Sequence, residues 1–179
     1  MKTRHRKKGQ LLKDVIFVLA LILAVAFIYV GLRFSLATDT PLVAISGQSM
    51  NPTLEDGDLT VVRGVPAEEI KVGDIIVFDP QNGVRTVHRV TRIQTLENGT
   101  LTFKTKGDAL DGDDPYTVYP ENIHGRLLYR IPYLGYLFLN PTILIIIIAI
   151  IVVIIILWPE RKGRFHHKTK TRSPTVEAT

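Results

Sequence analysis

Two long apolar runs, one near each end of the chain, most constrain what this sequence can fold into. Residues 15–32 are 18 residues without a charge, and residues 143–158 are a second uncharged run of 16 that extends back to Leu134 across an Asn-Pro pair. Neither run alternates apolar with polar residues, as a half-buried strand would. An 18-residue helix is about 27 Å long, close to the roughly 30 Å hydrocarbon core of a bilayer. The sequence therefore predicts transmembrane helices over residues 15–35 and 134–158.

The charges are unevenly distributed along the chain. Of the net charge of +5, residues 1–14 contribute +5, residues 159–179 contribute +4, and the part between them carries −4. Basic residues next to a membrane span stay in the cytoplasm, so both tails are predicted to be cytoplasmic and residues 36–132 to lie on the outer face. Because the middle is acidic, nucleic acid is excluded as a partner. The absence of cysteine excludes a disulfide framework and a thiolate nucleophile.

The first apolar run has an alternative interpretation as a cleaved secretory signal. It has a basic start, and Ser35-Leu36-Ala37 carries small residues where a cleavage site needs them. An uncleaved anchor is favoured, because the run is longer than the usual 7–15-residue signal core. Around the second run, four aromatic residues are candidates for interfacial belts: Tyr133, Tyr136, Phe138 and Trp158.

The middle segment has the pattern of an antiparallel β domain. Short β-branched runs are separated by turn-forming residues, and the turns at Asn82-Gly83 and Asn98-Gly99 are the best hairpin candidates. We predict a mainly β fold, a small antiparallel sheet or barrel-like domain flanked by two transmembrane helices. The expected strands are Leu42–Ile45, Leu59–Val62, Ile75–Phe78, Val84–Ile93, Thr100–Lys104 and Ile123–Tyr129.

Three features of this segment are candidates for a chemical role. Ser49 follows the first expected strand, with Gly47 two positions before it and Pro52 three after it, and such a turn can present a hydroxyl together with free N–H groups. A serine hydroxyl needs a neighbouring base to be a nucleophile, and His88 in the fourth expected strand is a candidate. On local residues alone, the favoured interpretations are that Ser49 stabilises a turn through its side chain and that His88 is an ordinary strand residue.

The third feature is an acidic loop with four carboxylates between Asp108 and Asp114. It is a Ca²⁺ loop, a solvated acidic loop, or the source of one carboxylate that orients a histidine. The spacing is not that of an EF-hand. Lys104 and Lys106 are alternative bases, but nearby acidic groups favour their charged form.

Four boxes in order give the chain a specific resemblance. Ser46-Gly47-Gln48-Ser49-Met50-Asn51-Pro52-Thr53, then residues 73–78, then His88-Arg89-Val90, then Thr105-Lys106-Gly107-Asp108 with a trailing Asp-Asp resemble type I signal peptidases over about residues 10–130. In the usual bacterial members a Lys stands where His88 stands here. With His at this position, the chain resembles the archaeal and endoplasmic-reticulum-type branch, which uses Ser, His and Asp.

The resemblance implies roles for individual residues. Ser49 would be the nucleophile, His88 the general base, Asp114 the carboxylate that orients His88, and Asp108 a second carboxylate tied to activity. Asp113 stays open as the orienting group, because the loop differs from the common pattern. Gln48 is an extra residue against the family's box, so backbone N–H groups around Ser49 would have to stabilise the oxyanion.

The resemblance also implies the activity. The chain is predicted to be a membrane-bound serine endopeptidase that removes signal peptides from exported preproteins after small residues, without a metal or organic cofactor. Its partners would be preproteins and the lipid bilayer, with the secretion machinery as a further candidate. Its expected location is the plasma membrane, multi-pass, with the catalytic domain outside. The alternatives are a non-enzymatic membrane-anchored β scaffold and a Ser-Lys peptidase that processes itself.

Overall fold

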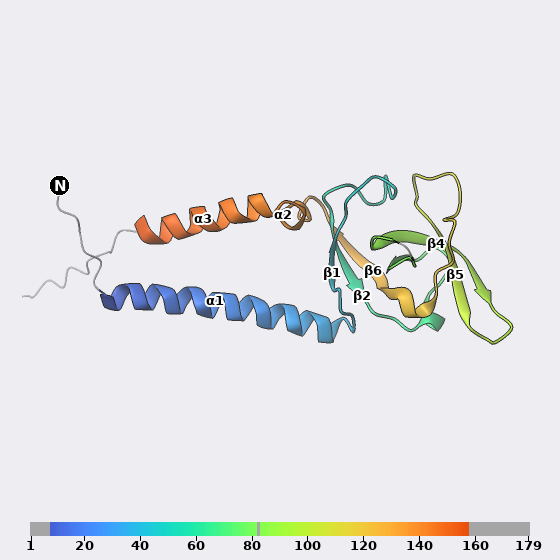
Figure 1. Cartoon of the computed structure of the whole chain (residues 1–179), viewed down its shortest axis with the longest axis horizontal. Helices are drawn as coiled ribbons and strands as arrows, with labels where there is room; N and C mark the ends of the chain where they lie inside the picture. Colours follow the sequence, from blue (N-terminus) through green and yellow to red (C-terminus); the bar gives the residue numbers. More distant parts are fainter. Residues whose placement is uncertain (1–7, 82, 158–179) are drawn as a thin grey trace, which may run out of the picture. The chain divides into compact units, whose positions relative to one another are not determined.

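The computed structural model describes residues 8–81 and 83–157 (Figure 1). The N-terminal part is one helix, α1 (Lys8–Ser35), whose segment Val15–Ser35 is the one helix among the described residues that is long and apolar enough to cross a membrane. Its apolar side chains are not covered by the rest of the protein, and Phe27, for example, is 80% exposed. Residues 1–7 and 158–179, which include most of both basic tails and Trp158, lie outside the described residues.

The second predicted span is wrong as a single helix. Residues 134–158 contain a short helix α2 (Tyr136–Leu139), a break at Asn140, and then α3 (Pro141–Leu157). Proline has no N–H to donate and fits the first position of a helix but not its interior, so the Asn-Pro pair ends one helix and starts the next. With 17 residues, α3 is about 26 Å long, and two spanning helices are not supported.

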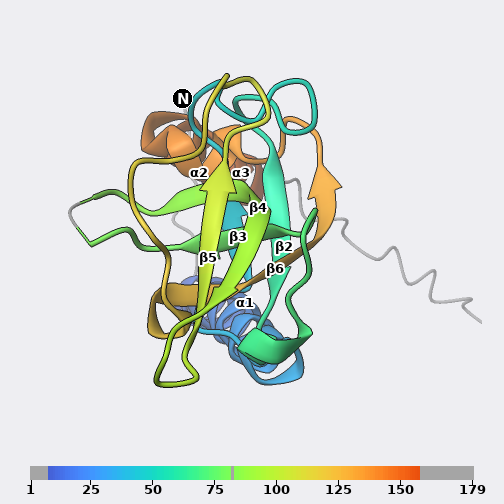
Figure 2. The same ribbon diagram turned by 90° about the vertical axis from the view of Figure 1, so that its right-hand side faces the viewer.

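The middle of the chain forms one antiparallel sheet of six strands, as predicted. The strands pair in the order β1-β2-β6-β3-β4-β5, and Figure 2 looks onto β4 and β5. Their bounds are Leu42–Ala44, Leu59–Arg63, Ile75–Phe78, Thr86–Thr95, Leu101–Lys106 and Ile123–Ile131 for β1 to β6. All six expected strands are therefore confirmed to within a few residues.

The sheet is open rather than closed into a barrel. Within the described residues, β1 pairs only with β2, and β5 pairs only with β4 apart from an isolated bridge between Phe103 and Val118. The hairpin at Asn98-Gly99 joins β4 to β5, where Gly99 has the positive φ of 83° that glycine adopts without strain. The β3–β4 hairpin is also present, although Asn82 itself lies outside the described residues.

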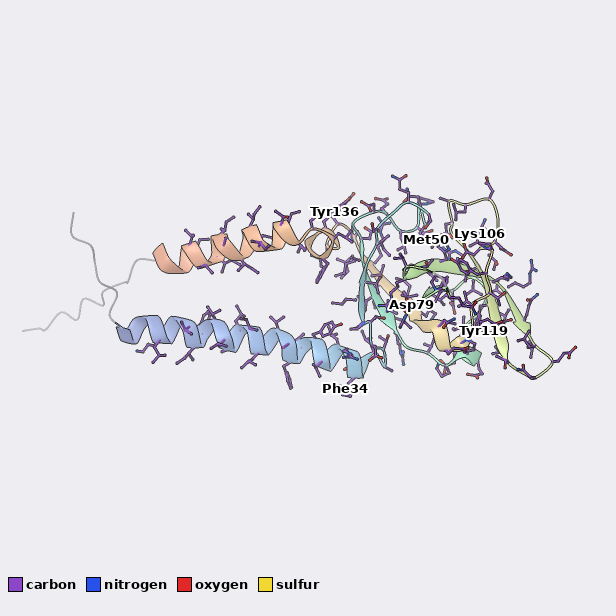
Figure 3. All side chains as sticks on the ribbon, viewed as in Figure 1. Phe34, Met50, Asp79, Lys106, Tyr119 and Tyr136 are labelled. Carbon is purple, nitrogen blue, oxygen red and sulfur yellow. The ribbon has the colours of Figure 1, made fainter. Side chains whose placement is uncertain are left out.

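The sheet's buried side chains form two clusters, and the smaller one contains Met50, the residue after Ser49. The larger cluster includes Phe78 and Phe103, which are both fully buried. The smaller contains Ile45, Met50, Leu54 and Ile75 (Figure 3 labels Met50). Met50 is 2% exposed, and burying such a side chain contributes about 1.5–3 kcal/mol. The loop after β1 is therefore held to the sheet immediately beside Ser49.

Candidate active site

Ser49, His88 and Asp114 come together from three separate parts of the fold. Ser49 lies in the loop after β1, His88 lies on β4, and Asp114 lies in the loop after β5. The Ser49 Oγ is 3.1 Å from His88 Nε2, and His88 Nδ1 is 2.7 Å from Asp114 Oδ2. Both distances are those of hydrogen bonds. The three side chains form a continuous chain from a hydroxyl through an imidazole to a carboxylate.

The surroundings of this chain are largely dry. The side chains of His88 and Asp114 are only 8% and 6% exposed. Thr105 Oγ1 donates to Asp114 Oδ2 at 2.6 Å, and the Asp114 N–H donates to the Thr105 carbonyl at 2.7 Å. The carboxylate is therefore fixed by β5 as well as by the imidazole. A proton on Nδ1 that is donated to the Asp114 carboxylate leaves the lone pair of Nε2 as the acceptor for the Ser49 hydroxyl.

Asp108 belongs to a different network. Arg89 Nε donates to Asp108 Oδ1 at 2.8 Å and Arg89 Nη2 donates to Oδ2 at 2.7 Å, so the pair is bidentate. The Thr53 hydroxyl donates to the same carboxylate at 2.5 Å. These hydrogen bonds, chiefly those of Arg89, hold the pKa of Asp108 below its usual value of 3.8, and the carboxylate raises the pKa of Arg89. Asp108 thus joins β4 to the loop that carries Ser49, and it makes no hydrogen bond to His88.

The other candidate groups of the acidic loop point elsewhere. Asp113 accepts a hydrogen bond from the Thr91 hydroxyl at 2.9 Å and lies 3.6 Å from Arg92. Lys104 Nζ donates to the Tyr116 carbonyl at 3.0 Å, and within the described residues neither Lys104 nor Lys106 hydrogen-bonds to Ser49. In the same part of the chain, no group of three or more His, Asp or Glu side chains is arranged so that it could hold a metal ion.

A glycine explains how the acidic loop approaches the serine so closely. A Cβ atom on Gly107 would lie 2.6 Å from the Ser49 carbonyl oxygen and 3.1 Å from His88 Nε2. The Ala109 N–H donates to the same Ser49 carbonyl at 2.9 Å. The loop after β5 and the loop after β1 are therefore in direct backbone contact at the site, which only a residue without a side chain allows at position 107.

A groove of about 510 Å³ opens beside Ser49 and His88. One wall is β1 and the loop after it, and the other is the start of β4 together with Tyr116. Burial raises the pKa of Tyr116. Since β1 is an edge strand, its outer backbone groups are available to an added strand. The groove therefore has the shape and the hydrogen-bonding edge for an extended peptide.

Comparisons with known proteins identify the family. Residues 24–111 match the Peptidase S24-like family model. The signal peptidase complex catalytic subunit SEC11 of Tuber melanosporum is 30% identical over 152 residues, which cover 75% of this chain and 81% of that protein. This chain belongs to the signal peptidase family. The SEC11C subunits of dog and human are 29% and 28% identical over 141 residues, 74% of this chain and 73% of each of those proteins. The chain is accordingly a serine peptidase, and the scaffold interpretation is wrong.

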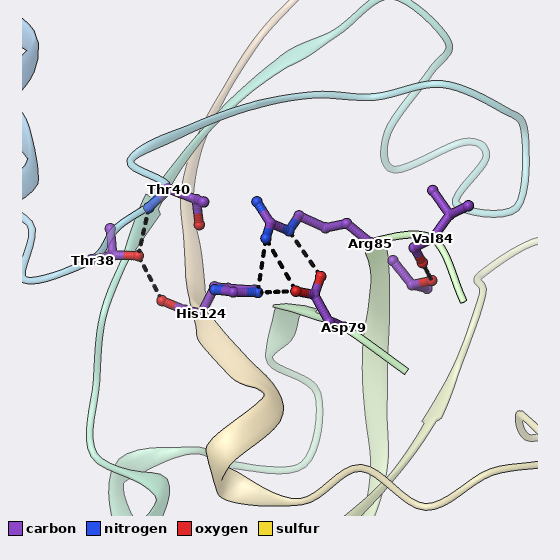
Figure 4. A network of polar contacts seen from close by, with 7 residues as sticks. Thr38, Thr40, Asp79, Val84, Arg85 and His124 are labelled. Atoms are coloured by element: carbon purple, nitrogen blue, oxygen red, sulfur yellow. Dashed lines mark hydrogen bonds and ion pairs between the residues drawn. The ribbon is translucent and has the colours of Figure 1, made fainter. Parts of the chain in front are cut away.

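The signal peptidase has a second histidine–aspartate pair that sequence reasoning did not use. His124 Nε2 lies 2.7 Å from Asp79 Oδ2, and Arg85 donates to both oxygens of that carboxylate at 2.9 and 3.1 Å (Figure 4). These contacts, first that of Arg85, lower the pKa of Asp79 to about 2. Both contacts of His124 use Nε2, and among the described residues neither of its ring nitrogens hydrogen-bonds to a serine hydroxyl in the way that His88 Nε2 does. The pair fastens β3 to β6 and to the base of β4.

Several supporting residues of the signal peptidase site were also missed, and part of that information was in the sequence. Arg89 directly follows His88 on a strand, so its side chain must leave on the opposite face and needs a partner there. Thr105 and Gly107 are inside the last box, but nothing in the spacing says which carboxylate Thr105 contacts. Thr53 closes the first box, and its contact with Asp108 joins residues 55 positions apart, which no local pattern reveals.

Proposed function

We propose that this signal peptidase cleaves peptide bonds with Ser49 as nucleophile, His88 as general base and Asp114 as the group that orients His88. The single observation that carries this assignment is the unbroken hydrogen-bonded chain from Ser49 Oγ to Asp114 Oδ2. Serine is unreactive at neutral pH unless a base removes its proton, and His88 Nε2 lies within hydrogen-bond distance of that hydroxyl.

The mechanism follows from the positions of the protons. Ser49 Oγ attacks the scissile carbonyl carbon while His88 Nε2 takes the hydroxyl proton, and the imidazolium is stabilised by Asp114. His88 then gives that proton to the leaving amine, and an acyl ester on Ser49 remains. Water attacks the ester with His88 again as base, which releases the new carboxylate and restores the serine. Asp108 does not contact the reacting groups in this mechanism. It accepts hydrogen bonds from Arg89 and Thr53 and thereby holds the loop that carries Ser49.

The oxyanion would be stabilised by backbone N–H groups at Ser49. Within the described residues the Ser49 N–H donates to no protein acceptor, whereas the Gly47 N–H is already engaged by Asp56. A free N–H beside the nucleophile is what a developing oxyanion needs. The extra Gln48 therefore leaves the function of this turn intact in the proposal.

The proposed substrate is a preprotein whose signal-peptide junction binds in the groove as an added strand beside β1. The relatives are named as catalytic subunits of a signal peptidase complex, which supports preproteins as substrates and partner subunits as a further proposal. Apolar residues around the serine, among them Ile45, Met50 and Val87, favour uncharged side chains next to the cut. Cleavage after small residues, as in Ala-x-Ala, is the specificity proposed.

The proposed location is a membrane, with α1 as an uncleaved anchor and the sheet on the outer face. The support is the exposed apolar surface of Val15–Ser35, with a mean hydropathy of 3.0. The division into a basic tail (1–14), a span (15–35), a catalytic domain (36–132), an apolar C-terminal segment (134–158) and a second basic tail (159–179) remains a proposal. The plasma-membrane location and a cytoplasmic C-terminus are also proposals. They are supported by the composition of residues 143–179, an apolar run followed by a basic tail. Protease accessibility of tags at each end in sealed vesicles tests it.

Cleavage of a preprotein by the detergent-solubilised full chain tests the assignment. Ser49→Ala, His88→Ala and Asp114→Ala should each lose nearly all activity, and Asp113→Ala is the matched control, since it removes the neighbouring carboxylate that does not contact His88. Full activity of Ser49→Ala would refute the mechanism. A Ser-Lys peptidase instead predicts that His88→Ala stays active while Lys106→Ala is dead.

A further inference from the structure

The segment that follows β6 packs against the loop that carries Ser49. Tyr136, the first residue of α2, lies with its ring on Gly57, where a Cβ would be only 2.1 Å from the ring carbon Cε2. One residue earlier, a Cβ on Gly135 would lie 2.3 Å from the Asp58 carbonyl oxygen. Two glycines, one on each side, thus allow the chain after β6 to lie directly on the end of the Ser49 loop (Figure 3 labels Tyr136).

A single carboxylate connects Tyr136 to the turn that contains Ser49. The Tyr136 hydroxyl donates to Asp56 Oδ2 at 3.1 Å, and the Gly47 N–H donates to Asp56 Oδ1 at 2.9 Å. Each oxygen of Asp56 therefore has its own donor. Gly47 lies two residues before Ser49, has the left-handed φ of 111°, and lines the peptide groove. The bridge links the segment after the sheet to the backbone beside the nucleophile.

Different contacts hold the two ends of the loop that carries Ser49. Residues after Ser49 contact β6, and residues before it contact Asp56. Arg130 on β6 donates to the Thr53 carbonyl at 3.1 Å and pairs with Asp58, whose side chain is fully buried. Residues 53–58 are therefore held by β6. Residues 46–48 are exposed, and the Asp56 contact is the side-chain hydrogen bond that the described residues provide to the backbone there. Without it, the exposed residues 46–48 would lose this side-chain contact, and the remaining support would come from Ser49 and Met50 on one side of them.

Tyr136 therefore differs from its aromatic neighbours. Tyr133 and Phe138 are 66% and 60% exposed, as expected for residues that face an interface, whereas Tyr136 is partly buried and hydrogen-bonded. We propose that Tyr136 and Asp56 are positioning residues of the peptidase site, which hold the Gly47 backbone, and through it Ser49, in the geometry for attack. This rests on the proposed role of Ser49 as nucleophile. It gives the segment after the sheet a part in the reaction beyond anchoring.

The test uses the full chain in detergent with four single variants and one double variant. Tyr136→Phe removes only the hydroxyl, and Tyr133→Phe is the matched control, since its hydroxyl makes no hydrogen bond among the described residues. Asp56→Ala removes both contacts of the bridge. Asp56→Asn is the conservative variant, because its amide can still accept from the Gly47 N–H and donate to the Tyr136 oxygen. Measurements are kcat and KM on a preprotein, the melting temperature, and amide hydrogen exchange over residues 46–49.

We expect Tyr136→Phe and Asp56→Ala to lower kcat by about tenfold, because small displacements of a nucleophile have large effects on rate. Tyr133→Phe and Asp56→Asn should stay near wild type. The double variant Tyr136→Phe/Asp56→Ala should be no slower than Asp56→Ala, since both act through one bridge. Faster exchange over residues 46–49 in Tyr136→Phe and Asp56→Ala should accompany the loss.

The proposal is overturned if Tyr136→Phe keeps the wild-type kcat and the wild-type exchange over residues 46–49, or if the effects of the two substitutions on kcat add. Failure of the proposed function would look different: the wild-type chain would not cleave the preprotein, or the Ser49→Ala variant would cleave it. In that case the exchange over residues 46–49 still decides whether Tyr136 and Asp56 hold the turn.

Discussion

Gly107→Ala is the substitution that most sharply tests the contact between the two loops of the site. The added Cβ would be 2.6 Å from the Ser49 carbonyl oxygen, whereas ordinary van der Waals contact begins at 3.4 Å, so the two backbones must separate by about 0.8 Å. The contact with the Leu110 side chain at 3.0 Å is relieved by a rotation, but the contact with a backbone oxygen is not. A displacement of about 1 Å at a reacting group costs up to about 100-fold in rate, or about 2.7 kcal/mol.

The assay is single-turnover cleavage of a preprotein by the full chain in detergent, with the melting temperature measured alongside. We expect Gly107→Ala to lose between about 10- and 100-fold in cleavage rate, because Ser49 moves away from His88. Gly112→Ala is the matched control in the same loop, since a Cβ there meets nothing within 4 Å. If Gly107→Ala cleaves at the wild-type rate while Gly112→Ala also does, the close approach of the loops is not part of the active geometry and the reasoning fails.

Three carboxylates should respond differently to neutralisation. Asp114→Asn should lower kcat by about 10³-fold or more through the wrong imidazole tautomer, and a loss below tenfold would contradict its orienting role. Asp108→Asn should lower the free energy of unfolding by about 2 kcal/mol, measured by denaturant titration, because it weakens a bidentate pair that is 14% exposed at the carboxylate; an unchanged midpoint would argue against that contribution. The Asp79 pKa of about 2 lies below its unfolded value of 3.8, so its stabilisation is complete above pH 3.8 and disappears as the pH falls through about 2. Since that side chain is 43% exposed, screening reduces the contribution to about 1 kcal/mol, and Asp79→Asn should be less stable than wild type at pH 7 but not at pH 2.

The strands of this protein were predictable because each is short, β-branched and bounded by turn residues. The order of the strands in the sheet was not, since β6 inserts between β2 and β3 through contacts that are distant in sequence. The break at Asn140 was visible as an Asn-Pro pair, yet hydrophobic length favoured one continuous helix over residues 134–158. Local proline chemistry outweighed composition there. Tyr136 shows the consequence, since a residue expected in an interfacial belt is partly buried against Gly57.

The candidate site was predictable to the level of residue identity but not of pairing. Ser49, His88 and Asp114 are in contact as the resemblance implied, whereas Asp108 makes no contact with His88. Spacing could not separate the two carboxylates, because both lie in one loop within seven residues. Nor could it reveal Thr105, whose hydroxyl fixes Asp114 from β5. Contacts of this kind depend on which loop side chain points toward the sheet, and that depends on packing against strand residues such as Thr105.

The alternation of side chains along β4 supplies the reason that two carboxylates are needed. His88 and Arg89 are adjacent on a strand, so they leave on opposite faces, and no single carboxylate can contact both in this geometry. Asp114 meets His88 on the buried face, and Asp108 meets Arg89 on the other, together with Thr53 from the Ser49 loop. In the proposed mechanism, one carboxylate therefore orients the base while the other holds the loop of the nucleophile against the same strand. Because β4 carries both contacts, this strand holds His88 directly and contributes to the position of the Ser49 loop through Arg89 and Asp108.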